Sequence, residues 1–154
     1  MEKELNQNQI SEVQINVCHK IYEFFKSLDG ASDFKIETET SGDDGDLSFS
    51  FEQSKTIFKV EVLSTEYFKL IRIINAFDFT ATKSIEEMNL LGRANQFNAY
   101  AVGIKALVHT KKVGYVDFCV DILSSKGDVN SSDLNLSLVL LRSAPMNFLA
   151  VTKD

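Results

Sequence analysis

The stretch from Ser84 to Leu123 places the strongest restriction on the fold, because a helical pattern in it runs directly into a hairpin pattern. Ser84 stands three residues before Glu87, which is the spacing of a capping box at the start of a helix. The sequence therefore predicts a helix over Ser84 to Tyr100. Its buried side is predicted from apolar residues at helical intervals: Leu90, Leu91, Ala94, Phe97 and Ala101.

The residues after this helix, Ala101 to Leu123, alternate between apolar and polar in two segments. A polar turn, Thr110 to Lys112, separates the segments. Strict alternation is typical of a strand with one buried face. The inward residues are predicted to be Val102, Ile104, Ala106 and Val108 in the first strand, and Val116, Phe118, Val120 and Ile122 in the second.

Several polar positions of the helix carry separate expectations. Gly92 costs about 1 kcal/mol relative to alanine in mid-helix, so we expect it to let another backbone come close. Asn95 and Asn98 are expected to bond free carbonyls or the first hairpin strand, with a polar ligand contact as the alternative. Arg93 is predicted to lie on the polar, solvent-facing side of this helix.

The N-terminal part of the chain predicts another helix, with an unusually wide apolar arc. Its stripe consists of Ile10, Val13, Val17, Ile21, Phe24 and Leu28, and is broadened by Ile15, Cys18, Tyr22 and Phe25. One sheet face does not require so wide an arc. The helix is therefore expected to touch a second surface, either elsewhere in the fold or on another subunit.

Four strands are predicted between the two helices. Phe34 to Thr40 is expected to be an edge strand, and the segments around Phe49 and Val60 form a second hairpin. Tyr67 to Phe77 is more continuously apolar and predicts an inner strand covered on both faces. Arg72 interrupts it, and we expect this arginine to snorkel or to pair with a carboxylate.

A last helix is predicted after residue 130, with Ser131 or Ser132 as its cap and Asp133 at its positive end. Pro145 is expected to break or kink it. The predicted order is helix, four strands, helix, two strands, helix. At 154 residues this is an α+β protein with one domain, residues 1 to 154.

Composition narrows the classes of partner. The formal net charge is -6, which argues against a nucleic acid partner because polyphosphates require a cationic surface. Residues Met1 to Gln9 lack the pattern of a secretion signal, and no run is long and apolar enough to cross a bilayer. Cys18 and Cys119 match no metal or redox spacing. We therefore expect a reduced, cytoplasmic protein without a membrane partner.

Reactive residues do not form a recognisable catalytic pattern. His19 falls on the polar side of the first helix, away from Cys18. Asp117 and Asp121 share a strand face with Cys119, where an acidic stripe could attract a cation or a basic partner; the simpler interpretation is an exposed sheet face. The acidic loop Ser41 to Asp46 lacks the spacing of a calcium loop. We expect no catalytic residue, no metal and no cofactor.

The order of elements resembles a YbjN-type domain, a bacterial family whose fold is similar to that of the class I type III secretion chaperones. The resemblance covers nearly the whole chain. It is most specific from Met88 to Ile122, where the segment Leu90-Leu91-Gly92-Arg93-Ala94-Asn95-Gln96-Phe97-Asn98 leads into the hairpin, and the acidic turn before Leu47 to Phe51 is similar too. The resemblance implies one twisted antiparallel sheet with helices packed mainly on one face.

The resemblance also implies a non-enzymatic protein that binds another protein, either as a chaperone-like module or as a regulator, and that acts as a homodimer holding a protein client. The residues expected at the partner surface are Ile15, Tyr22, Phe25, Leu107, Val113 and Tyr115. The alternative is a small-molecule-binding regulator with a pocket between sheet and helices, near Asn95, Asn98 and Arg72. A hydrolase or metal-dependent enzyme would require clustered titratable groups.

Overall fold

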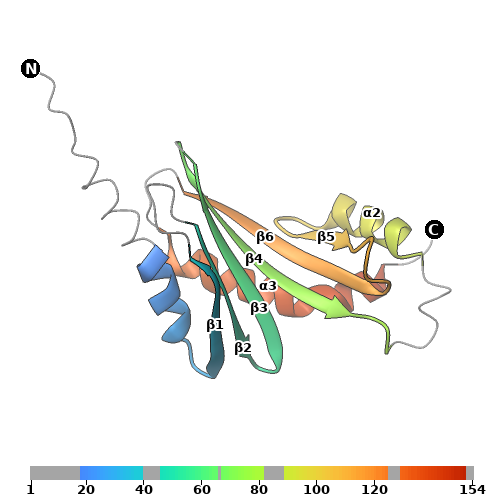
Figure 1. The fold of residues 1–154 in the computed structure, drawn as a ribbon. Helices are drawn as coiled ribbons and strands as arrows, with labels where there is room; N and C mark the ends of the chain where they lie inside the picture. The colour runs from blue at the N-terminus through green and yellow to red at the C-terminus, as the bar shows by residue number, and fades with distance from the viewer. Residues whose placement is uncertain (1–17, 40–45, 66, 82–88, 125–128, 152–154) are drawn as a thin grey trace, which may run out of the picture.

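The computed structural model of this protein describes residues 18–39, 46–65, 67–81, 89–124 and 129–151. A six-stranded antiparallel sheet dominates it, with the strand order β1-β2-β3-β4-β6-β5 (Figure 1). The strands are β1 (Ala31–Glu39), β2 (Leu47–Gln53), β3 (Thr56–Ser64), β4 (Lys69–Asp78), β5 (Lys105–Val108) and β6 (Tyr115–Ser124). The helices are a segment over residues 18–26, α2 (Leu90–Tyr100) and α3 (Ser131–Ala150).

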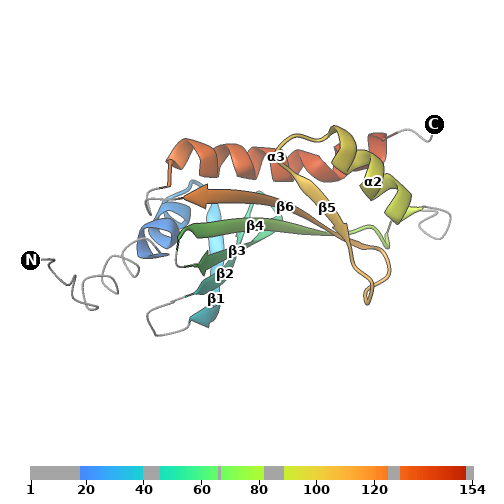
Figure 2. The ribbon, with the colours of Figure 1, turned by 90° about the horizontal axis from the view of Figure 1, so that it is seen from above.

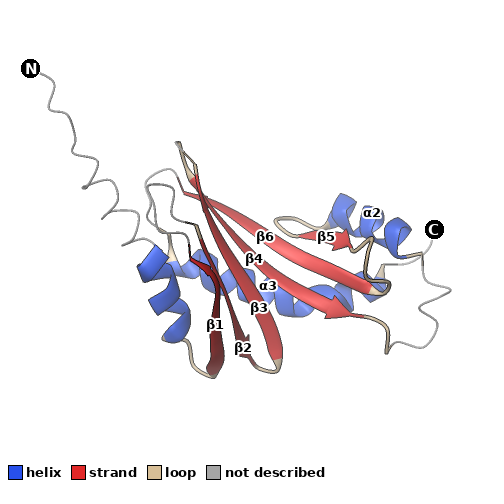
Figure 3. Cartoon of the chain, in the orientation of Figure 1, coloured by secondary structure: helices blue, strands red, loops and turns tan. Residues whose placement is uncertain are grey.

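The helices lie on one face of the twisted sheet. Figure 2 shows α3 running along this face, with α2 beside its C-terminal half. The helix over 18–26 covers the β1–β2 end, where Phe25 contacts Phe49 and Phe51. The order of elements and the α+β class are therefore as predicted. Figure 3 shows the helices and the strands of this arrangement in separate colours.

Alternation correctly located the two hairpins. The prediction that Val102 faces inward is wrong, because β5 begins only at Lys105 and Val102 is 89% exposed. The turn between β2 and β3 consists of Ser54 and Lys55, which both have positive φ, at 53° and 63°. Two consecutive positive φ values are typical of the type I′ turn, whose twist matches the flanking strands. Phe51 then pairs with Phe58 across the hairpin, and both side chains point into the core.

The inner position of β4 is confirmed, but the prediction that both of its faces are covered is wrong. Along Lys69–Asn75 the side chains alternate between buried positions and partly exposed ones. Ile71, Ile73 and Asn75 face the helices, whereas Leu70 and Ile74 face the opposite side. The continuous apolar run did not indicate two covered faces, because aliphatic side chains also occur on an open sheet face when their neighbours shield them.

Helix α2 begins later than predicted. Asn89, with non-helical backbone angles, is its N-cap and accepts a hydrogen bond from the Gly92 N–H at 2.9 Å. Ser84 and Glu87 lie outside the described residues. Gly92 has a different purpose from the expected one: a Cβ there would lie 2.5 Å from Asn89 Nδ2, so glycine makes room for the capping side chain. Leu91, predicted to be buried, is exposed.

Helix α3 is capped by Asn130, whose side chain accepts from the Ser132 N–H at 2.9 Å, and the predicted Ser131 or Ser132 cap is wrong. Asp133 lies in the first turn as expected. Pro145 does not end the helix, which continues to Ala150. Proline removes the amide that would bond the carbonyl four residues earlier. That carbonyl belongs to Leu141, and it accepts instead from Asn75 Nδ2 of β4 at 3.0 Å.

Candidate functional site

The residues predicted for a partner surface separate into two groups. Phe25 has no exposed surface and packs among phenylalanines, so its prediction is wrong. Tyr22 is half-buried, with its ring 5.0 Å from that of Phe49. The wide arc of the first helix is thus used inside the fold, as far as the structure describes it. Ile15 lies outside the described residues.

The other group lies on the β5–β6 hairpin. Leu107 and Val113 are exposed, and Tyr115 is half-buried. The Tyr115 hydroxyl donates to Asp78 Oδ2 at 2.8 Å, and this bond raises the pKa of the phenol. These positions are accessible, but they are few and are separated by polar neighbours. The prediction of a partner surface on the hairpin stays a prediction.

The sheet face away from the helices carries paired charges. Lys59 lies 3.2 Å from Glu37 and 3.1 Å from Glu61. On the neighbouring strands, Arg72 donates to both oxygens of Asp121, at 2.7 and 3.0 Å, which lowers the pKa of this carboxyl and raises that of the guanidinium. The expectation that Arg72 pairs with a carboxylate is confirmed. Such a charged, hydrated face is costly to bury against a partner.

Both carboxylates of the predicted acidic stripe on β6 have a side-chain partner. Besides the pair formed by Asp121, Asp117 Oδ2 lies 2.8 Å from His109 Nε2. Between them Cys119 is buried, its Sγ 3.7 Å from the Lys105 carbonyl, and desolvation raises the pKa of its thiol. A raised pKa opposes formation of the reactive thiolate. In the described ranges, no group of three or more potential metal ligands occurs.

Three further titratable groups lie at or near the start of the helix over 18–26. His19 is exposed, as its place on the polar side predicts, and Cys18 is half-buried. Lys69, at the start of β4, is buried, and desolvation lowers the pKa of its ammonium while the nearby Cys18 opposes the shift. Sequence reasoning missed this lysine because β4 begins with a charged residue that ordinarily faces water.

The small-molecule pocket expected near Asn95, Asn98 and Arg72 is not formed by these residues. Arg72 lies on the sheet face opposite the helices, and Asn95 is exposed. Asn98 is engaged with β5: its Oδ1 accepts from the Ala106 N–H at 2.7 Å, and its Nδ2 donates to the Ala106 carbonyl at 3.0 Å. The expectation that Asn98 bonds the first hairpin strand is therefore confirmed. It satisfies backbone groups at the sheet edge.

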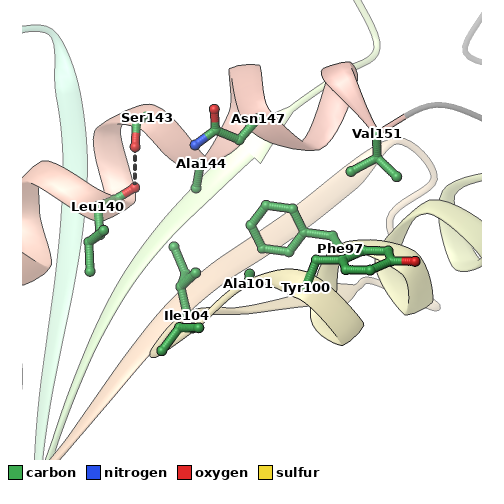
Figure 4. A pocket seen from close by; sticks show the side chains of 10 residues that line it. Phe97, Tyr100, Ala101, Ile104, Leu140, Ser143, Ala144, Asn147 and Val151 are labelled. Atoms are coloured by element: carbon green, nitrogen blue, oxygen red, sulfur yellow. Dashed lines mark hydrogen bonds between the residues drawn. The ribbon is translucent and has the colours of Figure 1, made fainter.

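A hollow of about 300 Å³ lies between α3 and the end of α2 (Figure 4). Its size is at the lower end of the range for ligand pockets. Figure 4 shows Leu140 and Ala144 pointing from α3 toward Ile104 and Phe97. We call this site the α2–α3 hollow, and its lining consists of Phe97, Tyr100, Ala101, Val102, Ile104, Leu140, Ser143, Ala144, Asn147 and Val151.

The α3 wall of the hollow has a characteristic spacing. Leu140, Ser143, Ala144 and Asn147 stand at positions i, i+3, i+4 and i+7, the arrangement that forms a hole for one side chain of a facing helix. Two of the four are small, which deepens the hole. Tyr100 and Val102 are exposed on the opposite rim. The hollow therefore suits an apolar side chain, while the Asn147 amide adds a polar group at its border.

The walls are held together by Arg93. Its Nη1 donates to the carbonyls of Leu149 at 3.1 Å and Val151 at 2.8 Å, at the C-terminal end of α3. The last turn of α3 has no basic residue of its own. The sequence-based placement of Arg93 on the wettable side of α2 is thus wrong. The sequence shows that the last turn of α3 has no cation of its own, and a cation is favourable there. It does not show which arginine, distant in the sequence, supplies that cation.

The outward side of α3 has no charge after the first turn. Its exposed residues from there on are Asn135, Leu136, Val139, Ser143, Met146, Asn147 and Ala150. Leu136, Val139 and Met146 keep 57%, 58% and 69% of their surface exposed. Arg142 turns aside to Gln53 Oε1 and the Phe58 ring. A helix with an apolar side away from its own core is typical of an interface.

No protein-family model, no curated protein and no solved structure matches this chain. The resemblance to the YbjN family therefore stays a prediction. Among the described residues, no helix has the length and apolarity needed to cross a membrane.

Proposed function

We propose that this protein is a non-enzymatic, cytoplasmic module that binds other proteins, acting as a homodimer that holds a protein client in a chaperone-like or regulatory role. The observation that carries the proposal is the apolar, uncharged surface formed by the α2–α3 hollow and the outward side of α3. Binding of a partner to such a surface is favourable because it removes apolar area from contact with water.

Strand addition is a poor route for a client to bind. At one sheet edge, β1 has irregular register between Ser32 and Lys35 and between Ile36 and Thr38. Such irregularities twist an edge strand away from pairing. At the other edge, Asn98 occupies the N–H and carbonyl of Ala106. The α2–α3 hollow instead favours recognition by side chains in a groove between helices.

Capture experiments with matched variants test the proposal. Val102→Glu places a carboxylate on the rim of the α2–α3 hollow, Leu107→Glu tests the hairpin surface, and Ile57→Glu is the control on the charged sheet face. All three positions are exposed, so the variants should fold. A client that the wild type and Ile57→Glu retain from lysate, but Val102→Glu does not, supports the proposal. Loss with Leu107→Glu alone would move the client site to the hairpin.

The alternative function is that of a small-molecule-binding regulator. The volume of the α2–α3 hollow supports this alternative. About 300 Å³ accommodates a compact apolar ligand as well as one or two side chains. Native mass spectrometry of the purified protein distinguishes the two functions. A ligand mass retained by the wild type and lost in Val102→Glu would support the regulator, whereas an unliganded chain with a captured protein supports the binding module.

A further inference from the structure

We propose that a second copy of this chain packs antiparallel along α3, using four residues that we call the α3 stripe: Leu136, Val139, Ser143 and Met146. The inference deepens the proposed function, since it rests on its homodimer and names the surface involved. The stripe residues follow one another at intervals of three, four and three, the heptad spacing of paired helices. All four are exposed, and none has a charge.

An antiparallel arrangement makes the stripe complementary to itself. With Leu136 opposite Met146 of the second copy, Val139 lies opposite Ser143 of the second copy, and both pairs recur on the other side of the two-fold axis. Val139 then meets a small residue at the centre, which lets the helices approach closely. The outer pairs bring together the two larger apolar side chains. A two-fold interface requires this reciprocity.

Charges at the ends of the stripe select the antiparallel direction. Asp133, in the first turn of α3, is exposed, and Arg93 of α2 is bound at the last carbonyls of α3. Antiparallel packing brings Asp133 of one copy toward Arg93 of the other, at both ends. Parallel packing would place the two Asp133 carboxylates together. Opposite charges at matching positions fix direction and exclude the wrong one.

The open sheet face is less favourable for a second copy. Each copy has a formal charge of -6, so close approach is opposed wherever acidic groups meet. The open sheet face has its Lys59 and Arg72 networks, whose burial would remove charged groups from water. The outward side of α3 avoids both costs, because after the first turn its exposed residues are all uncharged.

The first test is the mass of the full chain in solution. Sedimentation equilibrium at micromolar concentration should give a dimer for the wild type. Val139→Lys should weaken dimerisation by at least about tenfold in Kd, because two lysines would approach the centre of the interface. Ile57→Lys, which changes a similarly exposed aliphatic residue on the opposite sheet face, should leave the Kd unchanged. Circular dichroism verifies that both variants are folded.

Cysteine trapping tests the register without weakening the interface. In a Cys18→Ser background, a mixture of Val139→Cys and Ser143→Cys chains should form mixed disulfide dimers faster than either chain alone, because these two positions are opposite. Faster crosslinking of one variant with itself would overturn the proposed register. A wild-type dimer that Val139→Lys leaves intact would overturn the surface while the homodimer stands. A monomeric wild type that still captures a client through the hollow would mean that α3 serves a different partner.

Discussion

The hydrogen bond from Asn75 to the Leu141 carbonyl gives a sharp test of how the sheet holds α3. Pro145 cannot bond this carbonyl, and Leu141 is 0% exposed, so water cannot replace the Asn75 amide. We expect Asn75→Leu, which keeps the branched shape of the side chain but removes the donor, to lower the free energy of unfolding by about 1–3 kcal/mol. In a domain of this size the melting temperature should fall by roughly 2–4 °C for each kcal/mol.

Repeating the substitution in a Pro145→Ala background tests whether the Leu141 carbonyl is the reason for the effect. Alanine restores an N–H that can bond the Leu141 carbonyl within the helix, so the loss of the Asn75 donor should cost less there. Urea unfolding of the wild type, both single variants and the double variant yields the coupling free energy. We expect a coupling of about 1–2 kcal/mol. An equal cost of Asn75→Leu in both backgrounds would show that packing, and not the orphaned carbonyl, makes Asn75 important.

Three further outcomes follow from single contacts. Arg93→Met should destabilise the protein by about 1.5–3 kcal/mol, because two carbonyls lose a charged donor, and hydrogen exchange should show faster opening of the last turn of α3. Asn98→Ala should cost about 1–3 kcal/mol in urea unfolding by leaving the Ala106 backbone groups unpaired, with Asn95→Ala as the nearly neutral control. The pKa of Asp121 is lowered by Arg72, so its contribution to stability is present above the unfolded pKa of about 3.9 and is lost as the pH falls through the folded value. Asp121→Asn should therefore reduce the loss of stability in acid, by less than about 1 kcal/mol because the pair is partly exposed; an unchanged slope below pH 4 would contradict this.

Local pattern was sufficient for most of the architecture. Alternation located both hairpins, since the pleat places successive side chains on opposite faces whatever the partner strand is. The sequence also indicated that Arg72 pairs with a carboxylate, but only the fold shows that Asp121, on the neighbouring strand, is the partner. Helix starts were less accurate: Asn89 and Asn130 cap α2 and α3, and both stand near serines that were equally plausible caps from the sequence.

The sequence by itself thus determined the α+β class, the order of the elements and the absence of a recognisable catalytic pattern, because these depend on residue type and on spacing within a few positions. Only the tertiary structure decided what surrounds α3. Asn75 reaches a carbonyl 66 residues away, and Arg93 reaches carbonyls 56 and 58 residues away. The α2–α3 hollow likewise exists only where two helices meet. Contacts between distant segments leave no periodicity in either segment, and so the site could not be read before the fold was known.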